Sequence, residues 1–135
     1  MKFKVDFTTY LGVYKTVETE KLNVPTSEGR RTILSNHMPI MLSLDLGVVE
    51  TLEEGVINRY VVNGGVLYFE NNVAEIVADN VLTLDDIDVE RAAKSLEKAR
   101  ISIEKANREN ERIKAQEKYD IANFILKTAE KYKEQ

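Results

Sequence analysis

The chain has 135 residues, of which 43% are hydrophobic, so it can bury one modest core, or a smaller core with an appendage. It has no cysteine, which excludes disulfides and thiolate metal sites, and no apolar run approaches the ~18 residues of a membrane-spanning helix. The net charge of −4 and the lack of a basic stripe argue against nucleic-acid binding, because phosphate neutralisation supplies most non-specific affinity. The first residues alternate in polarity and lack the apolar stretch of a signal peptide.

Turn residues divide the chain into two parts. All six glycines and both prolines precede residue 66, and either residue destabilises the interior of a helix. Residues 1–84 carry seven Lys and Arg against eleven Asp and Glu, whereas residues 85–135 carry twelve of each. The sequence therefore predicts an α+β protein with two domains: a β-sandwich over 1–84 and a helical hairpin over 85–135.

The first part reads as a series of short strands. Residues 2–7 alternate strictly, with Phe3, Val5 and Phe7 on one face, as in a half-buried strand. Asn63-Gly64-Gly65 is interpreted as a tight hairpin turn, because Asn and Gly tolerate positive φ. The predicted strands are 2–7, 12–17, 20–24, 31–34, 40–46, 47–52, 55–62, 65–70 and 72–78. Their close spacing, without a helix long enough for a crossover, favours an antiparallel sandwich or flattened barrel.

The second part has the period of two helices. One apolar seam runs through Val89, Ala92, Leu96, Ala99, Ile103 and Ala106, and after a polar break another runs through Ala115, Tyr119, Ala122, Leu126 and Ala129. The short break predicts an antiparallel hairpin. A buried methyl contributes only ~0.8 kcal/mol against ~1.5–3 for a buried Leu or Ile, so the helices should pack weakly on each other. We expect a hairpin that opens without melting.

Three motifs in order point to a known family. The first motif is V-P-T-S-E-G at 24–29 followed by I-L-S-N-H-M-P-I at 33–40. The second is G-G-V-L at 64–67 followed by N-V at 72–73 and A-D at 78–79. The third is I-D-V-E-R-A at 87–92. In these motifs the chain resembles the epsilon subunit of the rotary F-type ATP synthase over essentially its full length.

The resemblance implies a non-catalytic central-stalk subunit of a bacterial enzyme, with no catalytic residue, no metal and no required cofactor. Its β-domain would bind the gamma subunit and the c-subunit ring, with Glu28, Arg30 and His37 facing the ring. Its helices would fold beside the sandwich, or extend to the catalytic alpha and beta subunits and inhibit ATP hydrolysis. The protein would then sit peripherally on the cytoplasmic face of the cell membrane.

The resemblance also raises the hypothesis of weak regulatory ATP binding by Ile87, Asp88, Arg91 and Ala92. Two departures weigh against this hypothesis. Leu82 stands where nucleotide-binding members have an acid, and no arginine follows Arg112. The simpler interpretation is that Asp88 and Arg91 belong to an ordinary first helical turn, with the acid favoured by the helix dipole. For His37 the simpler interpretation is a loop residue that hydrogen-bonds its own turn.

Two other functions compete with a regulatory subunit. One is a generic interaction module, in which the β-domain docks a partner and the hairpin acts as a coiled coil. The other, a small β-sandwich enzyme, is least favoured, because the chain has one histidine and no clustered nucleophile–base pair. Partner binding predicts an outward apolar patch on the sandwich. Candidate members are Met38, Met41, Tyr60 and Tyr68.

Overall fold

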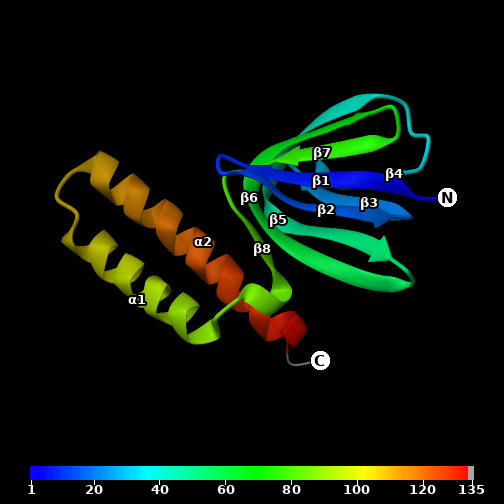
Figure 1. The fold of residues 1–135 in the computed structure, drawn as a ribbon. Coiled ribbons are helices and arrows are strands. Elements are labelled where there is room, and N and C mark those ends of the chain that lie inside the picture. Colours follow the sequence, from blue (N-terminus) through cyan, green and yellow to red (C-terminus); the bar gives the residue numbers. More distant parts are fainter. Residues whose placement is uncertain (134–135) are drawn as a thin grey trace. The chain divides into compact units, whose positions relative to one another are not determined.

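The computed structural model describes residues 1–133 and divides the chain into two compact units, Met1–Thr83 and Leu84–Gln135. The first unit holds the strands and the second the helices (Figure 1). The predicted fold class, a β-sandwich followed by a helical hairpin, is confirmed. That 1–84 and 85–135 act as separate domains stays a prediction.

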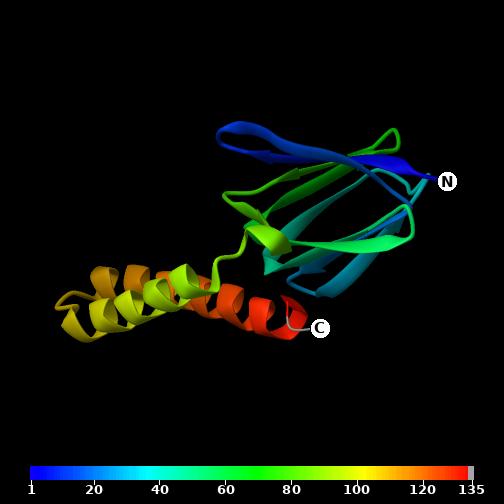
Figure 2. The ribbon, with the colours of Figure 1, turned by 60° about the horizontal axis from the view of Figure 1, so that its bottom comes forward.

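The first unit is one continuous sheet of eight strands. Their order is β2-β1-β7-β6-β5-β3-β4, with β8 paired to β6. Figures 1 and 2 show the sheet curling over so that its two halves face each other. The strands are β1 (Phe3–Thr9), β2 (Gly12–Thr19), β3 (Lys21–Thr26), β4 (Gly29–Leu34), β5 (Ile40–Glu53), β6 (Val56–Glu70), β7 (Val73–Val77) and β8 (Val81–Thr83).

The two central strands are longer than the sequence pattern indicates. The predicted pair 40–46 and 47–52 forms the single strand β5, and 55–62 and 65–70 form the single strand β6. The predicted hairpin turn at Asn63-Gly64-Gly65 is wrong, because these residues lie inside β6. Gly64 and Gly65 have φ of 68° and 124°. This conformation lets β6 bend, so that Tyr60–Val62 pair with β8 and Val66–Glu70 pair with β7.

One pair of strands departs from the expected antiparallel arrangement. β1 runs parallel to β7, with Lys4 opposite Val73 and Thr8 opposite Val77, while its other edge pairs antiparallel with β2. Local patterns of alternation do not report this pairing, because its partners lie at opposite ends of the first unit.

The core lies between the two halves of the sheet. Phe3 and Phe69 meet edge to face with ring centroids 5.4 Å apart, and Phe7 lies 4.5 Å from Tyr60. The other buried members of the cluster come from every strand, as the alternation predicts. They include Val5, Val17, Leu22, Val24, Ile33, Leu44, Val49, Val62, Leu67, Ala74, Ile76 and Val81.

The second unit is a helical hairpin. After the short 3-10 turn η1 (Leu84–Asp86), α1 (Val89–Lys105) and α2 (Glu109–Lys133) lie side by side (Figure 1). The buried positions of the two helices include the predicted alanines Ala92, Ala99, Ala115, Ala122 and Ala129. Over the described residues, no helix is both long and apolar enough to cross a membrane.

Candidate functional site

His37 lies in the loop between β4 and β5, residues 35–39, which forms no ladder hydrogen bonds. Its backbone N–H donates to the Leu34 carbonyl at 3.2 Å, and its Nδ1 lies 2.7 Å from the Met38 carbonyl oxygen. The imidazole also meets the ring of Phe69 edge to face, with centroids 6.0 Å apart. His37 therefore makes the turn contacts of the simpler interpretation, and Met38 beside it is exposed.

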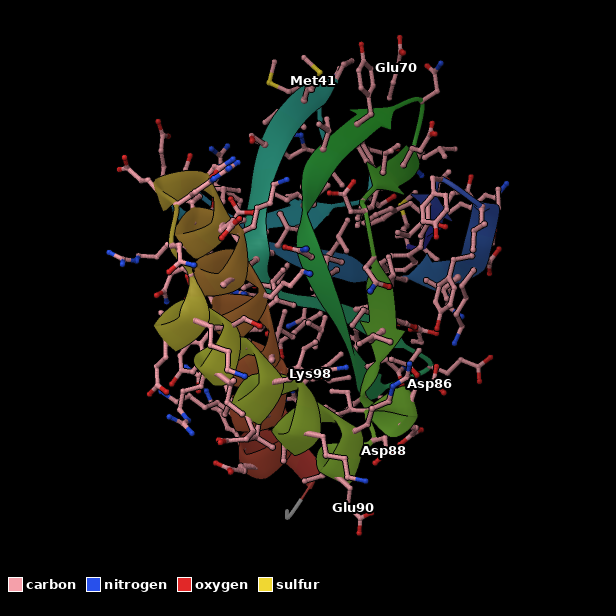
Figure 3. All side chains as sticks on the ribbon, turned by 90° about the vertical axis from the view of Figure 1, so that its left-hand side faces the viewer. Met41, Glu70, Asp86, Asp88, Glu90 and Lys98 are labelled. Atoms are coloured by element: carbon pink, nitrogen blue, oxygen red, sulfur yellow. The ribbon has the colours of Figure 1, made fainter. Side chains whose placement is uncertain are left out.

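A second turn, at residues 71–72 between β6 and β7, supports this loop. The Asn72 side-chain oxygen accepts the Asn36 backbone N–H at 2.7 Å, and its amide nitrogen donates to Ser35 Oγ at 3.1 Å. Figure 3 shows Met41, which follows the loop, and Glu70, which precedes the turn, at the same end of the sandwich. Ser35 is therefore part of a hydrogen-bond network that links the loop to the β6–β7 turn.

Glu28 lies in the turn between β3 and β4, and Arg30 is the second residue of β4. Thr26 Oγ1 donates to the Gly29 carbonyl at 2.5 Å and accepts the Glu28 N–H at 3.3 Å, which fixes the turn. The Arg30 guanidinium donates to the Val48 carbonyl at 2.6 Å, and it also contacts Asn23. One of its nitrogens lies 3.6 Å from the Glu50 carboxylate, which also pairs with Arg59 at 3.0 Å. Arg30 thus ties the turn beside it to the neighbouring strands.

The structure does not bring the three predicted ring-facing residues to one spot. Glu28 precedes β4 and His37 follows it, and the strand between them has six residues. At ~3.3 Å per residue this strand is about 20 Å long, and Glu28 and His37 lie beyond its opposite ends. That these residues face a ring stays a prediction, and the geometry restricts it to two separate contact points.

The predicted nucleotide residues lie at the start of α1. Asp88 is the N-cap, and its Oδ1 accepts the Arg91 backbone N–H at 3.2 Å. Figure 3 shows Asp88 and Glu90 at this first turn. Ile87 and Ala92 are buried, while Arg91 is exposed. The carboxylate of Asp88 is therefore used by the helix itself, and ATP binding here stays a prediction.

An apolar surface covers part of the outer face of the sandwich. Met41, Val66, Tyr68 and Val77 are between 40% and 63% exposed, and we call these four residues the outer patch. Met41 lies opposite Tyr68, and Val66 lies opposite Val77, on the adjacent strands β5, β6 and β7. Side chains in such positions are neighbours on one face, so the four form a contiguous surface.

Sequence reasoning found only part of the outer patch. Met41 and Tyr68 were among the candidates, whereas Val66 and Val77 were missed. The signal was present in β6, where Val66 and Tyr68 alternate with the buried Leu67. A strand that is apolar on both faces is typical of a sheet covered on both sides.

Tyr60 was predicted as a member of the outward patch, and this is wrong, because its side chain is only 1% exposed. Its hydroxyl donates to Glu53 Oε2 at 2.9 Å, and Thr51 Oγ1 donates to the same oxygen at 2.5 Å. Burial raises the pKa of the Tyr60 phenol above its usual value of 10.0, and the hydrogen bond to Glu53 raises it further.

This raised pKa predicts how stability depends on alkaline pH. The folded chain keeps the phenolic proton where the unfolded chain loses it, so stability is full below pH ~10 and falls as the pH rises further. Tyr60→Phe should cost about 1 kcal/mol of unfolding free energy at pH 8, because Glu53 loses a donor. By pH 11 the difference from the wild type should shrink. Urea unfolding at both pH values measures this, and an unchanged difference would contradict the assigned pKa direction.

The family described as "ATP synthase, Delta/Epsilon chain, beta-sandwich domain" matches residues 2–83. The ATP synthase epsilon chain of Levilactobacillus brevis is 41% identical over 63% of this chain, and the match spans 61% of that relative. The epsilon chain of Lactobacillus delbrueckii subsp. bulgaricus is 31% identical over 81% of this chain and 77% of its own length.

Solved structures agree with the family. One similar chain is found in the cryo-EM structure of the Euglena gracilis mitochondrial ATP synthase, which contains OSCP, F1 and the c-ring. It has a TM-score of 0.78 and 26% identity, and the match covers 95% of this chain and 81% of that chain. A chain of the Tetrahymena thermophila mitochondrial ATP synthase central stalk and c-ring shares the fold, with a TM-score of 0.59 at 15% identity, over 96% of this chain and 97% of that one. With the sandwich, the hairpin and these relatives together, the chain belongs to the ATP synthase epsilon chain family.

Proposed function

We propose that this chain is the non-catalytic central-stalk subunit of a bacterial F-type ATP synthase. In this role it couples the catalytic core to the c ring and restrains ATP hydrolysis through its helices. It lies peripherally at the cytoplasmic face of the cell membrane and requires no cofactor. The observation that carries the proposal is the outer patch, because an exposed apolar surface on a well-packed sheet is typical of a permanent docking face.

The proposed partners follow from the two kinds of surface on the sandwich. The outer patch offers apolar side chains and suits the gamma subunit, the predicted partner of the β-domain. The β3–β4 turn with Glu28, and the loop with His37, offer polar groups at two separate points and face the c ring. Arg30 supports the first of these points by holding its turn against Val48 and Glu50.

The proposed regulatory part is the hairpin, residues 85–135, which acts as a domain separate from 1–84. Its seam is built from alanines, whose burial contributes little per residue. In α1 the Arg100 guanidinium pairs with Glu97 at 2.5 Å and with Glu104 at 2.7 Å. Because these ion pairs lie within one helix, they are kept when α1 separates from α2. This supports a hairpin that opens with its helices intact and then reaches the catalytic alpha and beta subunits.

The test uses an ATP synthase complex depleted of this chain. Adding the wild-type chain should restore a stoichiometric complex and lower ATP hydrolysis. Val66→Glu places a charge in the outer patch and should weaken binding about tenfold or more, with hydrolysis left high. Val56→Glu is the matched control, because Val56 lies in the same strand β6, is 59% exposed, and lies outside the outer patch.

Two results would contradict the proposal. Hydrolysis that is unchanged by the bound wild-type chain would remove the regulatory role. Equal binding by Val66→Glu and Val56→Glu would remove the outer patch as the docking surface. Capture of the chain by proteins outside the ATP synthase would favour the generic interaction module instead.

A further inference from the structure

The side chain of Asn72 joins two segments that are 36 residues apart in sequence. It accepts the backbone N–H of Asn36 at 2.7 Å and exchanges hydrogen bonds with the Ser35 hydroxyl at 3.1 and 3.3 Å. Both partners lie in the loop that carries His37. One amide group thus connects the β6–β7 turn to the β4–β5 loop, and we call this set of hydrogen bonds the Asn72 clamp.

The local conformation places the amide where it can act. Asn71 and Asn72 have φ of 51° and 60°, a left-handed geometry that asparagine tolerates better than most residues. Asn36 at the other end of the clamp is also left-handed, with φ of 66°. The partner of its backbone N–H comes from another turn, because the N–H donates to the Asn72 side-chain oxygen.

The clamp acts on the segment that reaches His37. Between Leu34 and Ile40 the chain has no strand hydrogen bonds. The loop is held by its own turn bond from His37 N–H to Leu34, by the clamp, and by the Asn36 side-chain amide, which donates to Met1 Sδ at 4.0 Å. The imidazole is then held against Phe69 at a centroid distance of 6.0 Å. Removing the clamp frees the backbone immediately before His37.

We propose that Asn72 is a positioning residue, which fixes the loop of His37 and Met38 in the conformation that binds the c ring. This inference rests on the proposed function, since the ring is the partner proposed there. Preorganising a loop strengthens binding, because the ordering cost is met before the partner arrives. Loss of the clamp should therefore weaken binding without removing any side chain that faces the partner.

Three variants separate the clamp from the turn that carries it. Asn72→Gly removes the amide and keeps a residue that adopts positive φ freely. Asn71→Gly is the matched control: Asn71 is its neighbour in the same left-handed turn, and over the described residues its side chain has no hydrogen bond to the loop. Asn72→Asp is the conservative variant, because a carboxylate oxygen still accepts from Asn36 N–H and from the Ser35 hydroxyl.

The first measurement is made on the free chain. His37 is the one histidine of the sequence, so its ring-proton resonance is unambiguous, and its shift reports the neighbouring Phe69 ring. Asn72→Gly should move this resonance toward that of an unstructured peptide, while Asn71→Gly and Asn72→Asp should leave it near the wild-type position. Asn72→Gly should have a lower thermal midpoint than Asn71→Gly, because it loses the hydrogen bonds of the clamp, but both should be fully folded at the temperature of the measurement, which separates positioning from general unfolding.

The second measurement is binding to the c-ring and central-stalk assembly depleted of this chain. Asn72→Gly should bind about tenfold more weakly than the wild type, and Asn72→Asp should recover most of that loss. An unchanged His37 resonance in Asn72→Gly would overturn the inference, and so would a shifted resonance with wild-type binding. If the wild-type chain does not bind, the proposed function fails, and the resonance alone still decides whether Asn72 places the imidazole.

Discussion

Gly65→Ala is expected to destabilise the first unit by about 3 kcal/mol or more. Gly65 has φ of 124°, which a residue with a side chain rarely adopts. An added Cβ would also overlap the carbonyl oxygen of Val77 and lie 3.0 Å from Ala78 Cα. Val77 ends β7, and the N–H of Ala78 donates to the Thr8 carbonyl at 3.0 Å, so these backbone atoms cannot move without disturbing the pairing of β7. Urea unfolding followed by circular dichroism measures the loss.

Gly64→Ala is the matched control for this prediction. Gly64 also has positive φ, at 68°, but the nearest atom to an added Cβ is the Leu44 carbonyl oxygen, at an ordinary 3.6 Å. Only the left-handed backbone then opposes the substitution, at a cost of about 1–2 kcal/mol. Equal losses at the two positions would show that steric overlap at Gly65 is relieved, and would contradict the role given to the close approach of β6 and β7.

Ala99→Glu is expected to separate α1 from α2 while both remain largely helical. Ala99 is 5% exposed and lies on the seam of α1, where a carboxylate would have to be buried. We expect the free energy of pairing between the two helices to become less favourable by at least about 2 kcal/mol. The alanine seam contributes too little to keep the helices paired after such a loss. Distance labels on the two helices, combined with far-ultraviolet circular dichroism, would show a longer separation with little loss of helix.

The same substitution at Ala93 controls for helix propensity and charge. Ala93 lies in the same helix and is exposed, so Ala93→Glu should leave the labels at their wild-type distance. In the reconstituted complex, Ala99→Glu should lower ATP hydrolysis below the wild-type level, because the open hairpin is the inhibitory form in the proposed function. Loss of helicity together with the pairing would contradict a hairpin that opens with intact helices.

Much of the fold could be predicted because apolar residues recur at the period of a strand or of a helix within each element. The alternation of Phe3, Val5 and Phe7 fixes which face of β1 is buried, and all three side chains lie in the core. The alternation of three and four residues around Ala92 and Ala99 likewise identifies the buried seam of α1. Such patterns report directly on one face of one element, so they need no knowledge of the neighbouring elements.

What the sequence did not reveal depends on pairing between distant segments. Two predicted strands merge into β6 because Gly64 and Gly65 form a bend within the strand instead of a hairpin turn. Glycine suits a bend and a turn equally well, so the sequence does not distinguish the two. The short strand β8 has too few residues to show a period. Tyr60 was misassigned because its hydroxyl suits a surface as well as a buried partner such as Glu53.

The candidate site shows the same division. His37 could be singled out as the one histidine, and the Asp88 cap could be expected from its place before an apolar period. The Asn72 clamp could not be predicted, because its partners are 36 and 37 residues away and an Asn-Asn pair alone indicates only a turn. The tie between Arg30 and Glu50 depends in the same way on the packing of β3 against β5.

The parallel pairing of β1 with β7 has a consequence for how the protein is made. Strand β1, Phe3–Thr9, finds its partner β7 only when residues as far as Val77 have been synthesised. Contacts this distant in sequence slow folding, because a long loop must close before they form. Until then β1 and β2 exist at most as an isolated hairpin, which is marginally stable in water. The β1–β2 hairpin therefore stays without its β7 partner until Val77 has been synthesised, and the sandwich closes only after that.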